Sequence, residues 1–155
     1  MRKIFWNSLI KLAEKDKDII LLTDDLGYGY YDEFISRFPK QLINCGITEQ
    51  SMIGIAAGLV RAGKKPYCYG TIPFVLMRPY EQIRDDVAYP NLNVKIIGYS
   101  MPGFLGFAHN LEGTENEEDL LKNLPNIKVF KPTKETLEQI MFDSYLTKIP
   151  AYIHL

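Results

Sequence analysis

INCGITEQSMIGIAAG (residues 43–58) carries the pattern from which the fold can be read. An apolar run reaches Asn44, the chain turns at Gly46, and a segment with small and apolar residues on one helical face follows. Strand, glycine turn and helix in this order form the repeating unit of α/β proteins with a parallel sheet. On either side of this unit the chain alternates between short β-rich runs and longer helical patterns, so the unit is one of a series.

Six runs have the composition of strands, and several are apolar almost throughout, which is typical of strands covered on both faces of a parallel sheet. The predicted strands are Ile19–Thr23, Leu42–Asn44, Pro66–Tyr69, Val94–Gly98, Ile127–Phe130 and Ala151–Leu155. Apolar stripes at helical spacing lie between them. The predicted helices are Ile4–Ala13, Met52–Val60, Phe74–Ala88, Glu117–Asn123 and Thr133–Leu146.

Two positions set expectations about helix ends. Pro79 either stands in the first turn of the third helix or kinks it, because proline lacks the amide that a helix interior needs. Thr133 is expected to cap the last helix, with Thr136 facing inward. Together the elements predict a single doubly wound α/β domain over residues 1–155, with a mainly parallel sheet of about six strands flanked by helices.

Composition narrows the class of protein. The 155 residues include 18 Lys and Arg and 19 Asp and Glu. The resulting net charge of −1 excludes a broad basic surface for nucleic acid. No apolar run approaches the roughly 18 residues that a membrane span needs, and the first residues lack a signal-peptide core. Cys45 and Cys68 are too few for a disulfide framework or a zinc site. We therefore expect a cytoplasmic protein with no nucleic-acid or membrane partner.

Ligands of an open parallel sheet bind at the carboxyl ends of its strands. Those ends lead here into residues 24–27, 45–50, 70–74 and 99–110, and the irregular stretch 101–116 is expected to be functional. Three weaker signals have plainer interpretations. Gly27-Tyr28-Gly29 lacks a third glycine and indicates a turn. The acidic run 115–119 indicates a solvated helix start. His154 is expected to be a structural residue without a catalytic partner.

Glu49 follows directly after a predicted strand end, and the residues alone leave two interpretations open. It completes a helix start after Thr48 or Asn44, or it is a functional carboxyl at the ligand-binding edge.

The stretch around Glu49 resembles the signature of the pyrimidine-binding domain of the transketolase family, whose enzymes depend on thiamine diphosphate. The matching pattern is Asn44-x-Gly46-Ile47-x-Glu49-Gln50-x-Met52-x-Gly54-x-Ala56-Ala57-Gly58-Leu59. The resemblance continues in the family's order through Gly63-x-x-Pro66, Phe74–Arg84, Asn91-x-Asn93-Val94 and Leu124-Pro125-Asn126-x-x-Val129-x-x-Pro132. It covers nearly the whole chain, and it specifies the domain more closely than the reaction.

The resemblance implies a role for four residues at the cofactor. Thiamine diphosphate supplies an ylid and an electron sink, and its activation needs a carboxyl group at the pyrimidine ring nitrogen. Glu49 takes this role, and its burial favours the neutral form that can hold or release the proton. Ile47, Phe74 and Arg78 match cofactor-contacting positions, although a shift of one residue would put Val75 in place of Phe74, and Arg78 could equally serve a surface or interface.

His109 resembles a histidine with which transketolases contact the substrate, within Asp-Gly-Pro-Thr-His. Here Gly106-Phe107-Ala108-His109 keeps the histidine and lacks the Asp, Pro and Thr. The resemblance therefore implies that His109 contacts substrate or transfers a proton, while the departure puts the standard sugar-phosphate specificity in doubt.

The family's Gly-Asp-Gly motif with its paired asparagines, which holds Mg²⁺ and the cofactor diphosphate, does not occur in this sequence, and Asp24-Asp25 with Gly27 is no adequate substitute. We therefore expect another polypeptide to bind the magnesium and the diphosphate, and we expect the diphosphate-binding and C-terminal domains to be absent from this chain. The chain is then a natural subunit or an excised domain, and it is inactive without its partner.

The resulting prediction is the pyrimidine-binding part of a split transketolase-like transferase that moves a ketol unit from a ketose phosphate or a related donor. A homodimer or heterotetramer is expected, with an interface on helices Thr48–Val60 and Phe74–Ala88. The alternatives are a deoxyxylulose-phosphate-synthase-like enzyme acting on a keto acid, a 2-oxo acid dehydrogenase E1 β-like subunit, and a non-catalytic interaction module of the same fold.

Overall fold

All strands of the central sheet run parallel, in the order β2-β1-β3-β4-β6-β5. The computed structural model describes residues 1–100 and 117–155. The strands are β1 (Ile19–Thr23), β2 (Leu42–Asn44), β3 (Lys65–Thr71), β4 (Lys95–Tyr99), β5 (Lys128–Phe130) and β6 (Ala151–His154). The prediction of a doubly wound parallel α/β sheet is confirmed.

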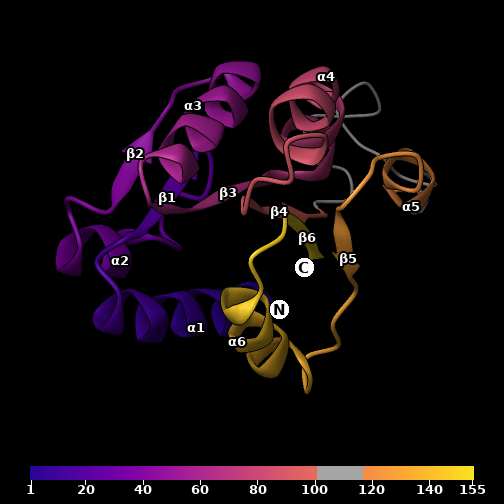
Figure 1. Cartoon of the computed structure of the whole chain (residues 1–155). Helices are drawn as coiled ribbons and strands as arrows, with labels where there is room; N and C mark the ends of the chain where they lie inside the picture. The colour runs from indigo at the N-terminus through magenta and orange to yellow at the C-terminus, as the bar shows by residue number, and fades with distance from the viewer. Residues whose placement is uncertain (101–116) are drawn as a thin grey trace.

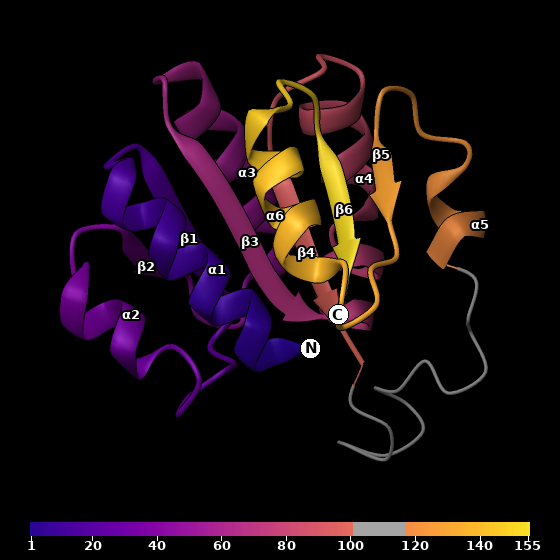
Figure 2. The ribbon, with the colours of Figure 1, turned by 90° about the horizontal axis from the view of Figure 1, so that it is seen from below.

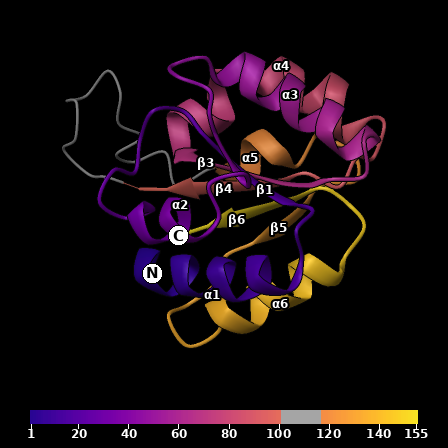
Figure 3. The ribbon, with the colours of Figure 1, turned by 90° about the vertical axis from the view of Figure 1, so that its left-hand side faces the viewer.

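Helices cover both faces of the sheet, as Figures 1 and 3 show. One face carries α1 (Arg2–Lys15), α2 (Asp32–Arg37) and α6 (Leu137–Leu146). The other carries α3 (Glu49–Arg61), η1 (Pro73–Met77), α4 (Tyr80–Gln82), η2 (Ile83–Ala88) and α5 (Glu117–Leu121). No helix among the described residues is long and apolar enough to cross a membrane.

The apolar runs are explained by these two layers. Along β1, Ile19 and Leu21 pack against the α1 layer, whereas Ile20 and Leu22 pack against the α3 layer. Successive side chains of a strand point to opposite faces, so a strand between two helical layers needs apolar residues at every position. Every residue of β1 is buried. Polar side chains are therefore displaced to the strand ends, and the carboxyl ends lie along one edge (Figure 2).

Three helix predictions need correction. Residues 32–37 form α2, which was not predicted because it is short and buries only Phe34. The last helix begins at Leu137 and not at Thr133, because Thr136 is its N-cap and lies exposed, with its hydroxyl accepting the Thr133 amide at 2.9 Å.

The predicted third helix is divided. Pro79 is the N-cap of α4 and so lies just before its first turn, not within it. A π-helical turn, η1, precedes Pro79, and a second, η2, follows the single turn of α4. Short π-helical segments often occur at functional sites.

Gly98 in β4 is required by packing. A Cβ atom there would lie 2.4 Å from the hydroxyl oxygen and 2.9 Å from a ring carbon of Tyr152, which is fully buried and cannot move aside. We expect Gly98→Ala to lower the free energy of unfolding by about 1–3 kcal/mol, as overpacking does. Urea unfolding followed by circular dichroism measures the change.

Gly58→Ala is the matched control, because Gly58 lies exposed in α3 with no neighbour within 4 Å of a Cβ atom. This variant should gain about 0.5–1 kcal/mol, since alanine loses less backbone entropy than glycine in a helix. Equal stability of the two variants would contradict the packing argument.

Candidate functional site

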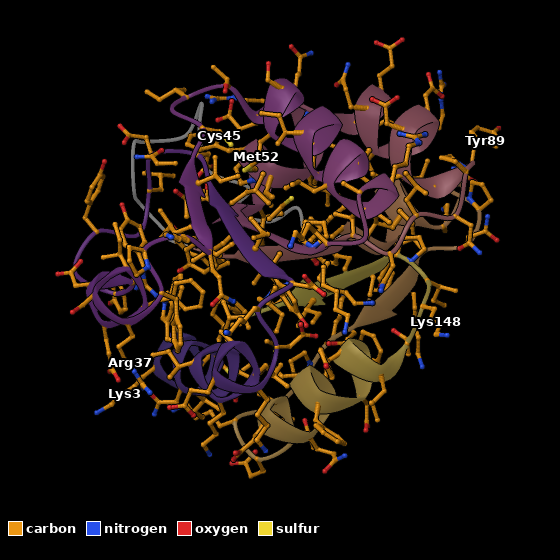
Figure 4. All side chains as sticks on the ribbon, turned by 60° about the vertical axis from the view of Figure 1, so that its left-hand side comes forward. Lys3, Arg37, Cys45, Met52, Tyr89 and Lys148 are labelled. Carbon is orange, nitrogen blue, oxygen red and sulfur yellow. The ribbon has the colours of Figure 1, made fainter. Side chains whose placement is uncertain are left out.

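Backbone and side-chain hydrogen bonds fix the turn that leads into α3. The Cys45 amide donates to the Thr23 carbonyl at 2.9 Å, which ties the turn to the end of β1. The Gly46 amide donates to Oδ1 of Asn44 at 2.9 Å, and the Thr48 hydroxyl donates to the Cys45 carbonyl at 2.7 Å. Gly46 has a φ of 69°, which glycine adopts readily. Figure 4 shows Cys45 where β2 enters this turn, and Met52 further along on α3. The turn thus places the first residue of α3 at the carboxyl edge.

Glu49, that first residue, is buried with 5% of its surface exposed. Its Oε1 lies 2.5 Å from Nη1 of Arg78, which stands directly after η1. The guanidinium carbon of Arg78 lies 3.8 Å from the centre of the Phe74 ring, within cation–π range. The Glu49 carboxylate is therefore directed across to the η1 segment, and it does not bond to the amides of its own helix.

Asp24, at the end of β1, is the functional candidate that sequence reasoning missed. It is 1% exposed, and neither of its carboxyl oxygens has a hydrogen-bond partner among the described residues. Burial, reinforced by the charge of Glu49, raises the pKa of Asp24 to about 7, although Arg78 acts in the opposite direction. An acidic pair directly after a wholly buried strand, Ile19–Thr23, was the available signal.

Asp25 stabilises the loop beyond. Its backbone has a φ of 62°, its carboxylate accepts a hydrogen bond from the amide of Asn44 at 2.8 Å, and the Tyr28 hydroxyl bonds to the same oxygen. These two bonds lower the pKa of Asp25. Two adjacent carboxyls therefore have opposite environments: one is exposed and bonded, and the other is buried and unpaired.

Three carboxyl residues and the arginine meet around one cavity of about 240 Å³. It is lined by Asp24, Asp25, Leu26, Ile47, Glu49, Phe74 and Arg78. A more open hollow of about 420 Å³ adjoins it and shares Ile47, Glu49 and Arg78. The structure thus brings together the sequence-predicted Ile47, Glu49, Phe74 and Arg78. Val75, the alternative to Phe74, is fully buried in the core and does not line the cavity.

The predicted His109 and the whole irregular stretch 101–116 lie outside the described residues. Within the described part of the chain, no group of three or more His, Cys, Asp or Glu side chains could hold a metal ion.

Glu117 corrects the interpretation of the acidic run as a solvated helix start, and it contacts His154. Glu117 is only 2% exposed and is not part of a solvated helix start. It bonds to Nδ1 of His154, accepts the Tyr152 hydroxyl at 3.2 Å, and lies 3.9 Å from Nζ of Lys131. His154 therefore has a carboxylate partner at the end of β6, and this cluster is separate from the cavity around Glu49.

The parallel sheet and the carboxyl-lined cavity at its carboxyl edge define a ligand-binding domain of the doubly wound class. A family model described as "Transketolase, pyrimidine binding domain" matches residues 1–147. The chain belongs to this family, and the resemblance noted in the sequence is confirmed.

Similar proteins include subunits of split transketolases. The chain is 37% identical over 135 residues to a subunit of the apulose-4-phosphate transketolase of Phocaeicola vulgatus, covering 84% of this chain and 42% of that protein. It is 33% identical over 141 residues to 1-deoxy-D-xylulose-5-phosphate synthase of Listeria monocytogenes, and this match covers 89% of this chain and 22% of that protein. A solved structure described as "Split gene transketolase, inactive beta4 tetramer" superposes with a TM-score of 0.83 at 30% identity, covering 99% and 50%. The chain spans about half the length, or less, of the relatives it matches.

The pKa of Asp24 predicts a pH dependence of stability. Between the ordinary value of 3.8 and the folded-state value of about 7, the folded chain retains a proton that the unfolded chain releases. The free energy of unfolding therefore falls as the pH rises through this window, by about 3 kcal/mol between about pH 5 and about pH 8. Asp24→Asn, which stays uncharged, should remove this decline in urea unfolding experiments.

Asp143→Asn, at an exposed carboxyl of α6, is the control and should keep the wild-type decline. An Asp24→Asn profile that stays parallel to the wild type would show that Asp24 titrates normally.

Proposed function

We propose that this chain supplies the pyrimidine-binding half of a thiamine diphosphate-dependent, transketolase-like transferase, and that a second chain supplies the Mg²⁺ and diphosphate site. The observation that carries the proposal is the buried Glu49 carboxyl, which lines a cavity together with the aromatic ring of Phe74. Membership of the family and the subunits of split transketolases among the relatives support it.

The residues present fit an aminopyrimidine ring. A cavity of 240 Å³ has about eight times the volume that one water molecule occupies in the liquid, which is room for one substituted six-membered ring. Phe74 offers an apolar wall, and Ile47, 72% exposed, offers an apolar rim. Polar groups placed within a mostly apolar pocket are typical of cofactor sites.

Each side chain then has a task. When bound, thiamine diphosphate supplies a carbon nucleophile and an electron sink. Glu49 holds or releases a proton at the pyrimidine ring nitrogen, and burial keeps water from competing for that hydrogen bond. Arg78 provides the countercharge to Glu49 and is itself positioned over Phe74. His109 would contact the substrate, a ketose phosphate or a related keto compound, from the irregular stretch.

The apolar side chains of the α3 layer support an interface there. Ile47, Ile55 and Met77 expose 72%, 42% and 45% of their surfaces, and aliphatic groups at this density favour burial against a partner. If this surface is the interface, the chain forms a dimer or a heterotetramer of two copies of each chain. The proposed enzyme acts in the cytoplasm, in carbohydrate metabolism.

A second candidate function is that of a deoxyxylulose-phosphate-synthase-like enzyme acting on a keto acid. The identity of 33% to such a synthase and the arginine at position 78 favour it. Substrate assays of the assembled enzyme with a ketose phosphate and with pyruvate distinguish the two.

Glu49→Gln tests the proposal in the complex with the diphosphate-binding chain, thiamine diphosphate and Mg²⁺. We expect the rate of cofactor C2 proton exchange, followed by NMR, to fall at least about 100-fold, because an amide cannot pass on a proton. The far-ultraviolet circular dichroism should not change. Glu138→Gln, at an exposed glutamate of α6, is the control. Unchanged exchange in Glu49→Gln would overturn the proposal.

Ile55→Glu tests the interface. A charge placed within an apolar contact should weaken assembly at least about tenfold in dissociation constant, measured by analytical ultracentrifugation. Phe142→Glu is the matched control, because Phe142 is 49% exposed but lies on α6, on the opposite face of the sheet. Equal weakening by both variants would contradict an interface on the α3 layer.

A further inference from the structure

Asp24 and Glu49 line the same cavity but have different surroundings. Glu49 has a guanidinium countercharge, with 2.5 Å between Oε1 and Nη1 of Arg78. Asp24 has no hydrogen-bond partner at either carboxyl oxygen within the described chain, no ion pair with Arg78 is formed, and only 1% of its surface is exposed. Because an unpaired buried carboxylate is costly, such a group keeps its proton instead. Two carboxyls whose environments differ in this way take different acid–base roles.

The fold is built to accept the Asp24 side chain. A Cβ atom on Gly70 of β3 would lie only 2.4 Å from Oδ2 of Asp24, so a glycine is needed at this point of the neighbouring strand. The hydroxyls of Thr23 and Thr71, at the ends of β1 and β3, are likewise buried without partners in the described residues. Native cores usually pair such atoms, and among the described residues with unpaired buried polar atoms Asp24 is the one that lines the cavity.

Some of the charged and titratable groups around Asp24 raise its pKa, and others lower it. Burial contributes most to the pKa of about 7; the residue's own backbone amide and Arg78 lower the pKa, and Glu49 and Asp25 raise it. Burial raises the pKa of the Cys45 thiol and of the Tyr99 hydroxyl, and the charge of Asp24 raises both further. The raised pKa of Asp24 agrees with its burial and with its lack of a hydrogen-bond partner among the described residues.

We propose that Asp24 is a proton-donating carboxylic acid of the cavity, and that together with the Glu49 carboxylate it binds a nitrogen heterocycle that accepts one hydrogen bond and donates another. The ligand class rests on the proposed function, in which the heterocycle is the aminopyrimidine of thiamine diphosphate. A neutral acid offers its hydroxyl as a donor, and a carboxylate only accepts. The pair therefore recognises a ring nitrogen and an N–H group, which two carboxylates would not do.

The first test is made on the full chain without ligand. Infrared spectra at about pH 6 should contain the carbonyl stretch of a protonated carboxylic acid, which disappears as the pH rises through the pKa of about 7. The band should be missing from Asp24→Asn and present in Asp143→Asn, whose altered carboxyl is exposed. Absence of the band from the wild type, or its persistence in Asp24→Asn, would overturn the proposal.

The second test measures the affinity of the complex with the diphosphate-binding chain for Mg²⁺ and thiamine diphosphate, by calorimetry. The wild-type dissociation constant should rise about tenfold between about pH 6 and about pH 8, which corresponds to one lost hydrogen bond. Asp24→Asn should bind about as tightly as the wild type does at the lower pH, without that dependence, because an amide keeps a donor. Asp24→Leu should bind at least about tenfold more weakly at both pH values.

A purely structural role would alter the stability of both variants but leave the pH dependence of affinity as in the wild type, and this result would overturn the proposal. A wild-type complex that binds no thiamine diphosphate at any pH would overturn the proposed function and the ligand class together. The infrared band of the ligand-free chain would still decide whether Asp24 carries a proton, so the two failures are distinguishable.

Discussion

The burial of the central strands on both faces is the constraint from which the site follows. β1, β3 and β4 lie between two helical layers, and nearly all of their side chains are enclosed. Polar chemistry therefore has no place along these strands and is confined to their ends. Since parallel strands end at one edge, residues distant in sequence converge there. Asp24, Glu49 and Phe74 follow three different strands and line one cavity.

The arrangement at this edge separates two carboxyls that are chemically alike. Glu49 stands at a helix start and receives an arginine from the η1 segment. Asp24 stands at a strand end, where the neighbouring backbone at Gly70 approaches too closely for any side chain. One carboxyl therefore faces a guanidinium countercharge, whereas burial raises the pKa of the other. The difference arises from the elements that carry them, not from their residue type.

The sequence predicted the elements well where periodic apolar patterns decide them, and poorly where partners far along the chain decide them. The parallel sheet and the position of Glu49 follow from the alternation and from the strand–turn–helix pattern. The burial of Glu117 does not follow from any local pattern, because its partner His154 is 37 residues away along the chain. Asp24 was missed for the same reason: its unusual environment depends on Gly70 and Glu49, which no local pattern connects to it. Local chemistry also misplaced one helix end, because Thr133 and Thr136 are both acceptable caps three residues apart.

The cavity resembles one half of a larger binding site. Ile47 lines both hollows while exposing 72% of its surface, so the apolar rim of the cavity faces outward. The described residues offer a ring-sized space lined by three carboxyl residues and an arginine, but no group of three or more His, Cys, Asp or Glu that could hold a metal ion. In the proposed function, the ring of the cofactor occupies this space and a second chain supplies the oxygen ligands for magnesium and the diphosphate. The exposed apolar rim around Ile47 is then the place where that chain would close the site.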